Sequence, residues 1–217
     1  SANESGSGAY AYTGAGDVLK VVDVSDPANP LFAGRLVLPG TITAIAARDD
    51  TLFVWTGTRT FCIVDARVPE NPHLVGRVDL EDTAVEFPSI AVAESYAFVT
   101  RGFWDLGWSG IPSGIRVIDV RDPKAPVEAT RYDGDYESIA ISGNNLYALS
   151  NEPETGWRVD LLDVSDPTNP TTLGSYLGHA EWRGFDVMAD GPDIFVTSGW
   201  VIEIIDFSDP TAPTEIG

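Results

Sequence analysis

The chain has 217 residues, of which 33 are acidic and 13 are Lys or Arg, and its formal net charge is −20. This balance argues against nucleic acid as a partner, because phosphate contacts rely on Lys and Arg. No stretch reaches the roughly 18 apolar residues of a membrane helix, so direct membrane insertion is not expected. The single cysteine, Cys62, excludes an intrachain disulfide.

A ten-residue phrase recurs along the chain in five closely related copies. They read "VVDVSDPANP" from residue 21, "IVDARVPENP" from 63, "VIDVRDPKAP" from 117, "LLDVSDPTNP" from 161 and "IIDFSDPTAP" from 204. The first aspartates of successive copies are 42, 54, 44 and 43 residues apart, which gives a period of about 43 with one insertion at 101–114. A fixed period of this length predicts a repeat architecture.

Each repeat contains four short runs with β-strand character. In the third repeat they are "GIRVIDV" (114–120), "VEATRYD" (127–133), "SIAIS" (138–142) and "NLYALS" (145–150). Turn residues separate the runs, and no window shows a sustained 3.6-residue apolar stripe, so helix is essentially absent. Four antiparallel strands in each unit predict an all-β fold, a β-propeller built from four-stranded blades.

The phrase itself predicts a structural turn. Its aspartate and serine side chains can accept hydrogen bonds from turn amides, and its two prolines fix the connection. We therefore expect a structural role for Asp26, Pro27, Pro30 and their counterparts. The alternative is a Ca²⁺ site in each turn, although one such corner lacks the six to eight oxygens that calcium requires. The second copy, with Val68 in place of the second aspartate, would be the weakest such site.

The phrase also carries a family resemblance. Together with "LVGRV", "TLGSY" and the hairpin "AISGNNLYAL", it resembles the LVIVD repeat of bacterial and archaeal surface proteins, over nearly the whole chain from about residue 9. The resemblance implies a β-propeller in secreted, envelope-attached or multidomain exported proteins, mostly without an assigned reaction. It brings no catalytic residues with it. Ala66, Val68 and the insert at 101–114 depart from the family pattern.

Counting the copies predicts one propeller domain over residues 1–217 with five blades. The repeats run over about 18–60, 61–113, 114–157, 158–200, and 201–217 joined with 1–17. The last of these is a split closing blade, in which "GAYAYTG" (8–14) joins the two ends of the chain. Its inner strand is either a poor one formed by "SANESG" or missing, in which case the chain is a piece of a larger propeller. The opening "SANESGSG" has no basic and apolar leader, which indicates a cytoplasmic protein or a signal peptide already removed.

The loops opposite the recurring turns vary between the copies, and variable loops on a rigid scaffold often carry binding sites. Aromatic residues gather in these loops and predict a surface for a protein partner or a sugar. They are Phe103, Trp104 and Trp108 in the insert, and Trp157, Trp182 and Trp200 elsewhere. The alternative is that the insert packs its own aromatic side chains and that Trp182 packs between blades.

Acidic residues form a second group in the variable loops. Glu86, Asp135 and Glu181 enter the predicted inner strands at one equivalent position and could hold a cation or sugar hydroxyls, or could simply be solvated. His179 beside Glu181 could form a metal pair. However, His73 lies elsewhere and no HxH or HExxH spacing exists, so no transition metal and no cofactor are predicted, calcium aside.

These observations favour a non-catalytic extracellular or cell-surface module for binding or assembly. The reason is that scaffold residues repeat along the chain, whereas no set of reactive residues does. The partner would be another protein, further copies of the chain in a surface layer or filament, or a glycan. The alternative is a glycoside-processing enzyme using Glu86, Asp135 and Glu181 at the channel mouth. That chemistry needs two carboxylates roughly 5 to 9.5 Å apart.

Overall fold

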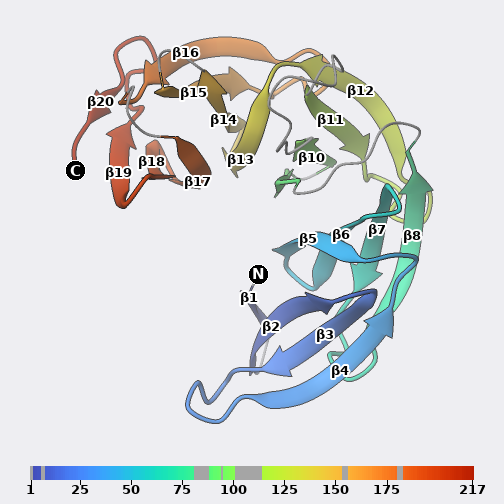
Figure 1. Cartoon of the computed structure of the whole chain (residues 1–217). Coiled ribbons are helices and arrows are strands. Elements are labelled where there is room, and N and C mark those ends of the chain that lie inside the picture. The colour runs from blue at the N-terminus through green and yellow to red at the C-terminus, as the bar shows by residue number, and fades with distance from the viewer. Residues whose placement is uncertain are drawn as a thin grey trace. The chain divides into compact units, whose positions relative to one another are not determined.

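The computed structural model describes residues 2–5, 8–80, 88–93, 95–100, 114–152, 156–179 and 183–217. These residues form twenty β-strands and no helix, arranged in five four-stranded antiparallel sheets (Figure 1). Within this part of the chain, no helix is therefore long and apolar enough to cross a membrane. The predicted all-β fold of four-stranded blades is confirmed.

The chain divides into two compact units, which are described separately. The first unit comprises residues 1–87 and 119–128, and the second comprises residues 88–118 and 129–217. The first two sheets lie in the first unit. The third sheet lies mainly in the second unit but contributes its outer turn, residues 119–128, to the first.

The first unit contains two sheets whose strands lie side by side in chain order. The first sheet consists of β1 (Ala2–Ser5), β2 (Gly8–Ala15), β3 (Val18–Asp23) and β4 (Leu31–Val37). The second sheet consists of β5 (Ile42–Arg48), β6 (Thr51–Thr56), β7 (Thr60–Asp65) and β8 (His73–Asp79). Leu19 and Val21 of β3 pack against Leu52, Val54 and Cys62 of the second sheet, and these five side chains are fully buried.

The second unit holds the other three sheets. The third is β9 (Ile90–Val92), β10 (Tyr96–Thr100), β11 (Gly114–Asp119) and β12 (Val127–Asp133). The fourth is β13 (Tyr136–Ser142), β14 (Asn145–Glu152), β15 (Gly156–Asp163) and β16 (Thr171–Leu177). The fifth is β17 (Gly184–Asp190), β18 (Asp193–Ser198), β19 (Val201–Asp206) and β20 (Thr214–Glu215).

Strand β14 shows why the central strands are nearly continuous apolar runs. Leu146 and Ala148 belong to a core cluster shared with the third sheet, whereas Tyr147 and Leu149 belong to a cluster shared with the fifth. Successive side chains of a strand point to opposite faces of its sheet. A sheet with a neighbour on each side therefore needs apolar residues at both sets of positions.

The recurring phrase forms two successive turns, each closed by an aspartate. In the fourth copy, Asp163 Oδ1 accepts a hydrogen bond from the Ser165 amide at 2.8 Å, and Asp166 Oδ1 accepts one from the Thr168 amide at 3.0 Å. The bond from the Ser165 amide, followed by the Ser165 hydroxyl, lowers the pKa of Asp163. The same contacts are made by the first aspartates Asp23, Asp65, Asp119 and Asp206 and by the second aspartates Asp26, Asp122 and Asp209.

The predicted structural role of the phrase is confirmed by these bonds. The second copy, which has Val68 in place of an aspartate, keeps only the backbone part of its second turn. There the Asn71 amide donates to the Val68 carbonyl at 2.9 Å. The side-chain bond is lost without loss of the turn, because the prolines and the backbone bond remain.

The recurring turn also packs against the outer strand of the sheet before it, at a glycine. A Cβ atom at these glycines would overlap the carbonyl oxygen of a turn proline. The pairs are Gly34 with Pro69, Gly76 with Pro123, and Gly174 with Pro210. The phrase therefore joins consecutive sheets as well as ending a strand. The third sheet departs from this rule, because Thr130 stands where the other outer strands have glycine.

The predicted split closing blade is not confirmed. Strand β2, which contains "GAYAYTG", pairs with β1 on one side and β3 on the other, and β19 pairs with β18 and β20. The reason is local: a two-residue turn with Gly16 at φ 65° lets β2 fold back directly onto β3, and a short connection costs less entropy than joining distant ends. Ala2–Ser5 does form a strand, but it pairs with β2 in the first sheet rather than completing a split blade with residues 201–217.

Candidate functional site

Several predicted site residues lie outside the described part of the chain, and their roles remain predictions. They are Glu86, Phe103, Trp104, Trp108, Glu181 and Trp182. The glycosidase alternative needs Glu86 and Glu181 together with Asp135, and since two of these three carboxylates lie outside the described residues it stays a prediction. Asp135 itself is exposed, between β12 and β13.

Trp157 was predicted to bind a partner, and this prediction is wrong. Its side chain is fully buried in the core of the second unit, and its ring centroid lies 5.7 Å from that of Tyr176. The segment "NEPETGW" resembles a loop in sequence, but β14 and β15 extend through it until Glu152 pairs with Gly156. The longer hairpin places Trp157 on a strand that faces the fifth sheet.

Trp200 is a surface residue, as predicted. It lies in the turn between β18 and β19 and is 92% exposed. Gly199, at φ 53°, permits the tight turn that carries it. A tryptophan this exposed can contribute to binding, since a partner that covers it would remove a large apolar surface from water.

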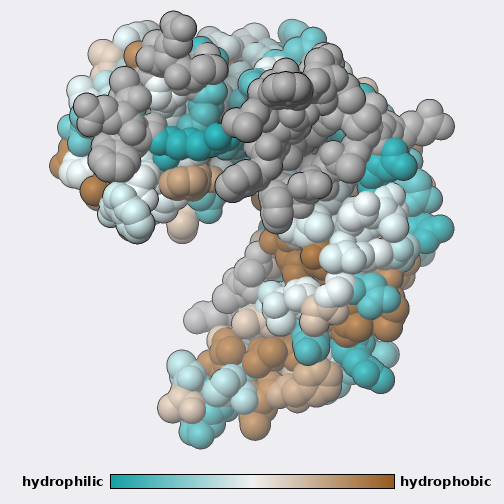
Figure 2. All heavy atoms as spheres, viewed as in Figure 1, coloured by the Kyte–Doolittle hydropathy of each residue, from teal (hydrophilic) through white to brown (hydrophobic). Residues whose placement is uncertain are grey.

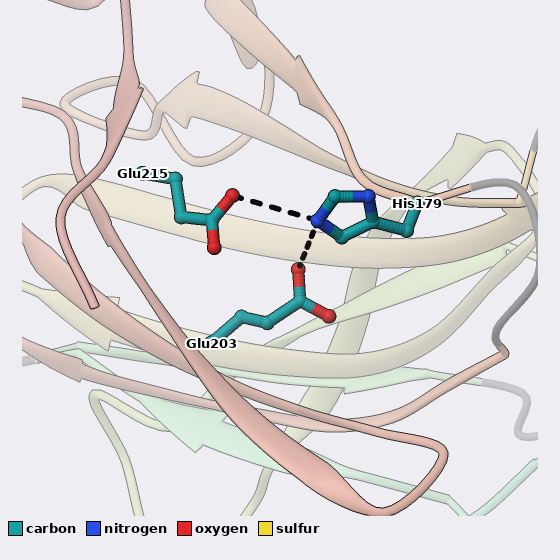
Figure 3. Close-up of side chains that lie close together, drawn as sticks. All are labelled: His179, Glu203 and Glu215. Carbon is teal, nitrogen blue, oxygen red and sulfur yellow. Dashed lines mark ion pairs between the residues drawn. The ribbon is translucent and has the colours of Figure 1, made fainter.

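His179, predicted as a binding residue, lies in a cluster with two carboxylates that sequence reasoning missed. Figure 3 shows His179 between Glu203 of β19 and Glu215 of β20. Its Nε2 lies 3.8 Å from Glu203 Oε2 and 3.6 Å from Glu215 Oε2, which are ion-pair contacts when the imidazole is protonated. One donor atom from each of the three residues lies within 4.8 Å of the others.

Glu203 is the unusual member of the cluster, because it is only 4% exposed. Its Oε1 accepts a hydrogen bond from the Ser198 hydroxyl, while its Oε2 accepts none from any described residue. Burying a carboxylate oxygen without a partner is costly. The free oxygen is the one that faces His179 (Figure 3).

Asp160 occupies the equivalent position in the fourth sheet, three residues before the first motif aspartate, and is fully satisfied. Its oxygens accept hydrogen bonds from the Tyr136 hydroxyl at 3.1 Å and the Ser175 hydroxyl at 2.6 Å, and Arg158 Nε lies 3.1 Å away. Burial, and then the charge of Asp160, raises the pKa of Tyr136, so that hydroxyl remains a donor. Glu203 has a similar burial but lacks most of these partners.

A signal for Glu203 does exist in the sequence. The strand "VIEIID" carries a charged residue at the position that the exposed Lys20 fills in the first copy and that Cys62, Arg116 and Asp160 fill in the next three copies. All three are buried, so this column of the repeat faces a neighbouring sheet. Glu215 and His179 give no such signal, because each lies beside Glu203 only once the fifth sheet has formed.

The fifth sheet also exposes an apolar face, on the side away from the fourth sheet. Large apolar side chains remain largely solvent-accessible around this face, with Met188 66%, Ile202 62% and Ile216 58% exposed. Pairing places Met188 opposite Phe195 and Phe195 opposite Ile204, so these residues share a face. Asp190, Asp193 and Asp206 form an acidic row at one edge of it. We call this surface the fifth-sheet face.

The first sheet has an exposed face of its own, on the side away from the second sheet. Register pairs Val18 with Val37 and Lys20 with Arg35, and pairs Val22 with Phe32. Phe32 and Val37 are each 63% exposed, and Figure 2 shows hydrophobic residues in brown over β2, β3 and β4. We call this surface the first-sheet face. It places two basic residues among apolar ones, in a chain with only 13 Lys and Arg.

Comparison with solved structures identifies the fold. A chain of a mitotic checkpoint complex superposes with a TM-score of 0.65 at 11% identity, covering 96% of this chain and 62% of that one. Apo AztD from Citrobacter koseri gives 0.62 at 16% identity, with 99% and 60% covered. A chain of a nidogen–laminin complex gives 0.57 at 13% identity, with 93% and 74% covered.

The chain thus spans about three-fifths of the length of the first two structures. AztD and the nidogen–laminin chain are β-propellers, and likeness at this identity establishes the fold alone. No curated protein sequence matches the chain.

Sequence comparison identifies the repeat. Residues 5–37, 133–178 and 198–217 match the LVIVD repeat. Each matched segment includes a third strand of a sheet and runs through the recurring phrase into the outer strand. With three matched segments and five four-stranded sheets of the propeller type, the chain contains LVIVD repeats and has the β-propeller fold.

Proposed function

We propose that this protein is a non-catalytic binding and assembly module that works outside the cell or at its surface. The observation that carries the proposal is the fifth-sheet face, an exposed apolar surface of a kind that the other sheets of the second unit bury. The acidic composition supports the location, because a net charge of −20 is best tolerated where salt screens it.

The fifth-sheet face resembles surfaces that this fold covers with another sheet. On its other side, the same sheet buries Val187, Ile194 and Val196 against the fourth sheet. Contiguous exposed apolar residues mark interaction sites when they are rimmed by polar ones. Trp200 adds a large anchor at the edge of the face, and exposed tryptophans often dominate binding energy.

The occupant that fits this surface is the first-sheet face of a second copy of the chain. Both surfaces are sheet faces with exposed apolar residues, which pack together as sheets do elsewhere in the fold. Their charges are opposite, since Lys20 and Arg35 lie on one and the row of Asp190, Asp193 and Asp206 on the other. Such a heterologous contact uses two different surfaces and builds rings or filaments rather than a closed symmetric dimer.

Proteins of similar fold occur in protein complexes, which supports protein binding without identifying a partner. Two of the solved structures similar in fold are chains of protein complexes, a mitotic checkpoint complex and a nidogen–laminin complex. A glycan partner, bound through the aromatic loops, has less support, because Trp157 is buried.

The test is the oligomeric state of the purified chain by analytical ultracentrifugation over a range of concentrations. We expect concentration-dependent association that Ile202→Arg on the fifth-sheet face abolishes and that Lys20→Glu on the first-sheet face weakens. Leu177→Arg is the matched control, because Leu177 is 54% exposed but lies on the outer strand of the fourth sheet. A particle that stays monomeric at every concentration, or equal effects of Ile202→Arg and Leu177→Arg, would overturn the proposal.

A further inference from the structure

We propose that His179, Glu203 and Glu215 form a binding site for a divalent transition metal of the zinc class. The site is separate from the interface proposed above and does not depend on it. It combines an exposed imidazole, a half-exposed carboxylate and a buried carboxylate, whose donor atoms all lie within 4.8 Å of one another (Figure 3).

The spacing of the donor atoms suits one small cation. Zinc binds imidazole nitrogen and carboxylate oxygen at about 2.0 to 2.2 Å, which separates tetrahedral ligand atoms by about 3.4 Å. His179 Nε2 lies 3.8 Å from Glu203 Oε2 and 3.6 Å from Glu215 Oε2. A contraction of a few tenths of an ångström along these two edges, together with closure of the edge between the two carboxylate oxygens from within 4.8 Å to about 3.4 Å, brings all three groups to binding distance.

The second observation is the buried free oxygen. Glu203 Oε2 accepts no hydrogen bond from a described residue and points toward His179. The equivalent carboxylate, Asp160, is held by two hydroxyls and a guanidinium. A cation between His179 and Glu203 would supply the compensation that Asp160 receives from protein groups.

Neighbouring side chains hold the carboxylates in place, as they commonly do around metal ligands. The Ser198 hydroxyl donates to Glu203 Oε1 and so leaves Oε2 directed at the cluster. The Tyr176 hydroxyl donates to Glu215 Oε2 at 3.3 Å.

The donor set selects the class of metal. Imidazole nitrogen favours zinc and neighbouring transition metals over calcium and magnesium, which prefer six or more oxygens. Two carboxylates and a neutral imidazole carry a charge of −2, which one divalent cation balances, whereas a protonated imidazole balances only half of it. Three protein ligands leave a position for water or for a group from a partner.

The experiment titrates the full chain, freed of metal by a chelator, with zinc chloride alone and with calcium chloride alone, by isothermal titration calorimetry. We expect one zinc per chain and clearly weaker calcium binding. His179→Ala and Glu203→Gln should each weaken zinc binding by at least about tenfold, as losses around metal sites do. His73→Ala is the matched control, because His73 is the other histidine and lies on β8 in the first unit.

A second readout separates metal binding from a structural role of the cluster. Zinc bound to the native state raises the unfolding temperature, so we expect a rise for the unmodified chain and for His73→Ala but none for His179→Ala. His179 is 61% exposed, so its replacement leaves the core intact. Zinc binding that His179→Ala leaves unchanged, or no saturable zinc binding at all, would overturn the proposal.

Discussion

Two buried carboxylates at one position of the repeat, Asp160 and Glu203, illustrate how single residues differ within a common scaffold. Both lie three residues before a motif aspartate and face a neighbouring sheet. Asp160 is compensated by Tyr136, Ser175 and Arg158. Asp160 shows that the core of the repeat holds a charge where other strands of the same sheet compensate it.

Tyr136→Phe tests the compensation of Asp160. Removing the hydroxyl deletes a hydrogen bond to a charged acceptor, and we expect the free energy of unfolding to fall by about 1.5 to 3 kcal/mol. Tyr147→Phe is the comparison, because the Tyr147 hydroxyl donates at 3.2 Å to a neutral acceptor, the Gly191 carbonyl. Its loss should be about 0.5 to 1.5 kcal/mol. Urea denaturation of both variants measures the difference, and equal losses would show that Asp160 does not depend on Tyr136.

The strands and the recurring turns can be predicted from the sequence because their signals are local. Short apolar runs, glycines and the Asp-Pro phrase each act within a few residues, as the hydrogen bonds of Asp163 and Asp166 show. The cluster around Glu203 could not be predicted, since His179 lies in the connection that follows β16 and Glu215 lies at the end of β20. The prediction that Trp157 binds a partner was wrong for a similar reason, because only the register of β14 and β15 reveals that its segment is a strand.

The packing of each turn on the preceding sheet gives a prediction for the repeat element. Gly76→Ala should lower the free energy of unfolding by about 1 to 3 kcal/mol, because the added methyl overlaps the Pro123 carbonyl oxygen and forces two chain segments apart. Gly57→Ala is the control in the same unit, since a Cβ there meets its nearest neighbour, the Thr41 carbonyl oxygen, at an ordinary 3.7 Å.

Thermal and urea unfolding of the two variants provide the measurement. A loss confined to Gly76→Ala supports the role of the turn in joining sheets. If both alanine variants unfold alike, the glycine is present for another reason.

At the scale of the whole molecule, the repeated sheets stabilise the folded state, whereas the net negative charge destabilises it. Five sheets of one design bury apolar surface in continuous clusters and stabilise the fold. Thirty-three acidic residues against 13 basic ones leave a net charge of −20. Self-repulsion of this kind destabilises a compact state, and salt screens it.

Ionic strength should therefore set the stability of the entire chain. Raising sodium chloride from 0.01 M to 1 M shortens the Debye length from about 30 Å to about 3 Å. A gain of about 1 to 2 kcal/mol from screening would raise the unfolding temperature by roughly 2 to 8 °C for a chain of this size. Calorimetry in sodium chloride and in potassium chloride measures the effect, and we expect the two salts to agree because screening depends on ionic strength. An unfolding temperature that stays constant or falls with salt would mean that the acidic residues are already compensated within the fold.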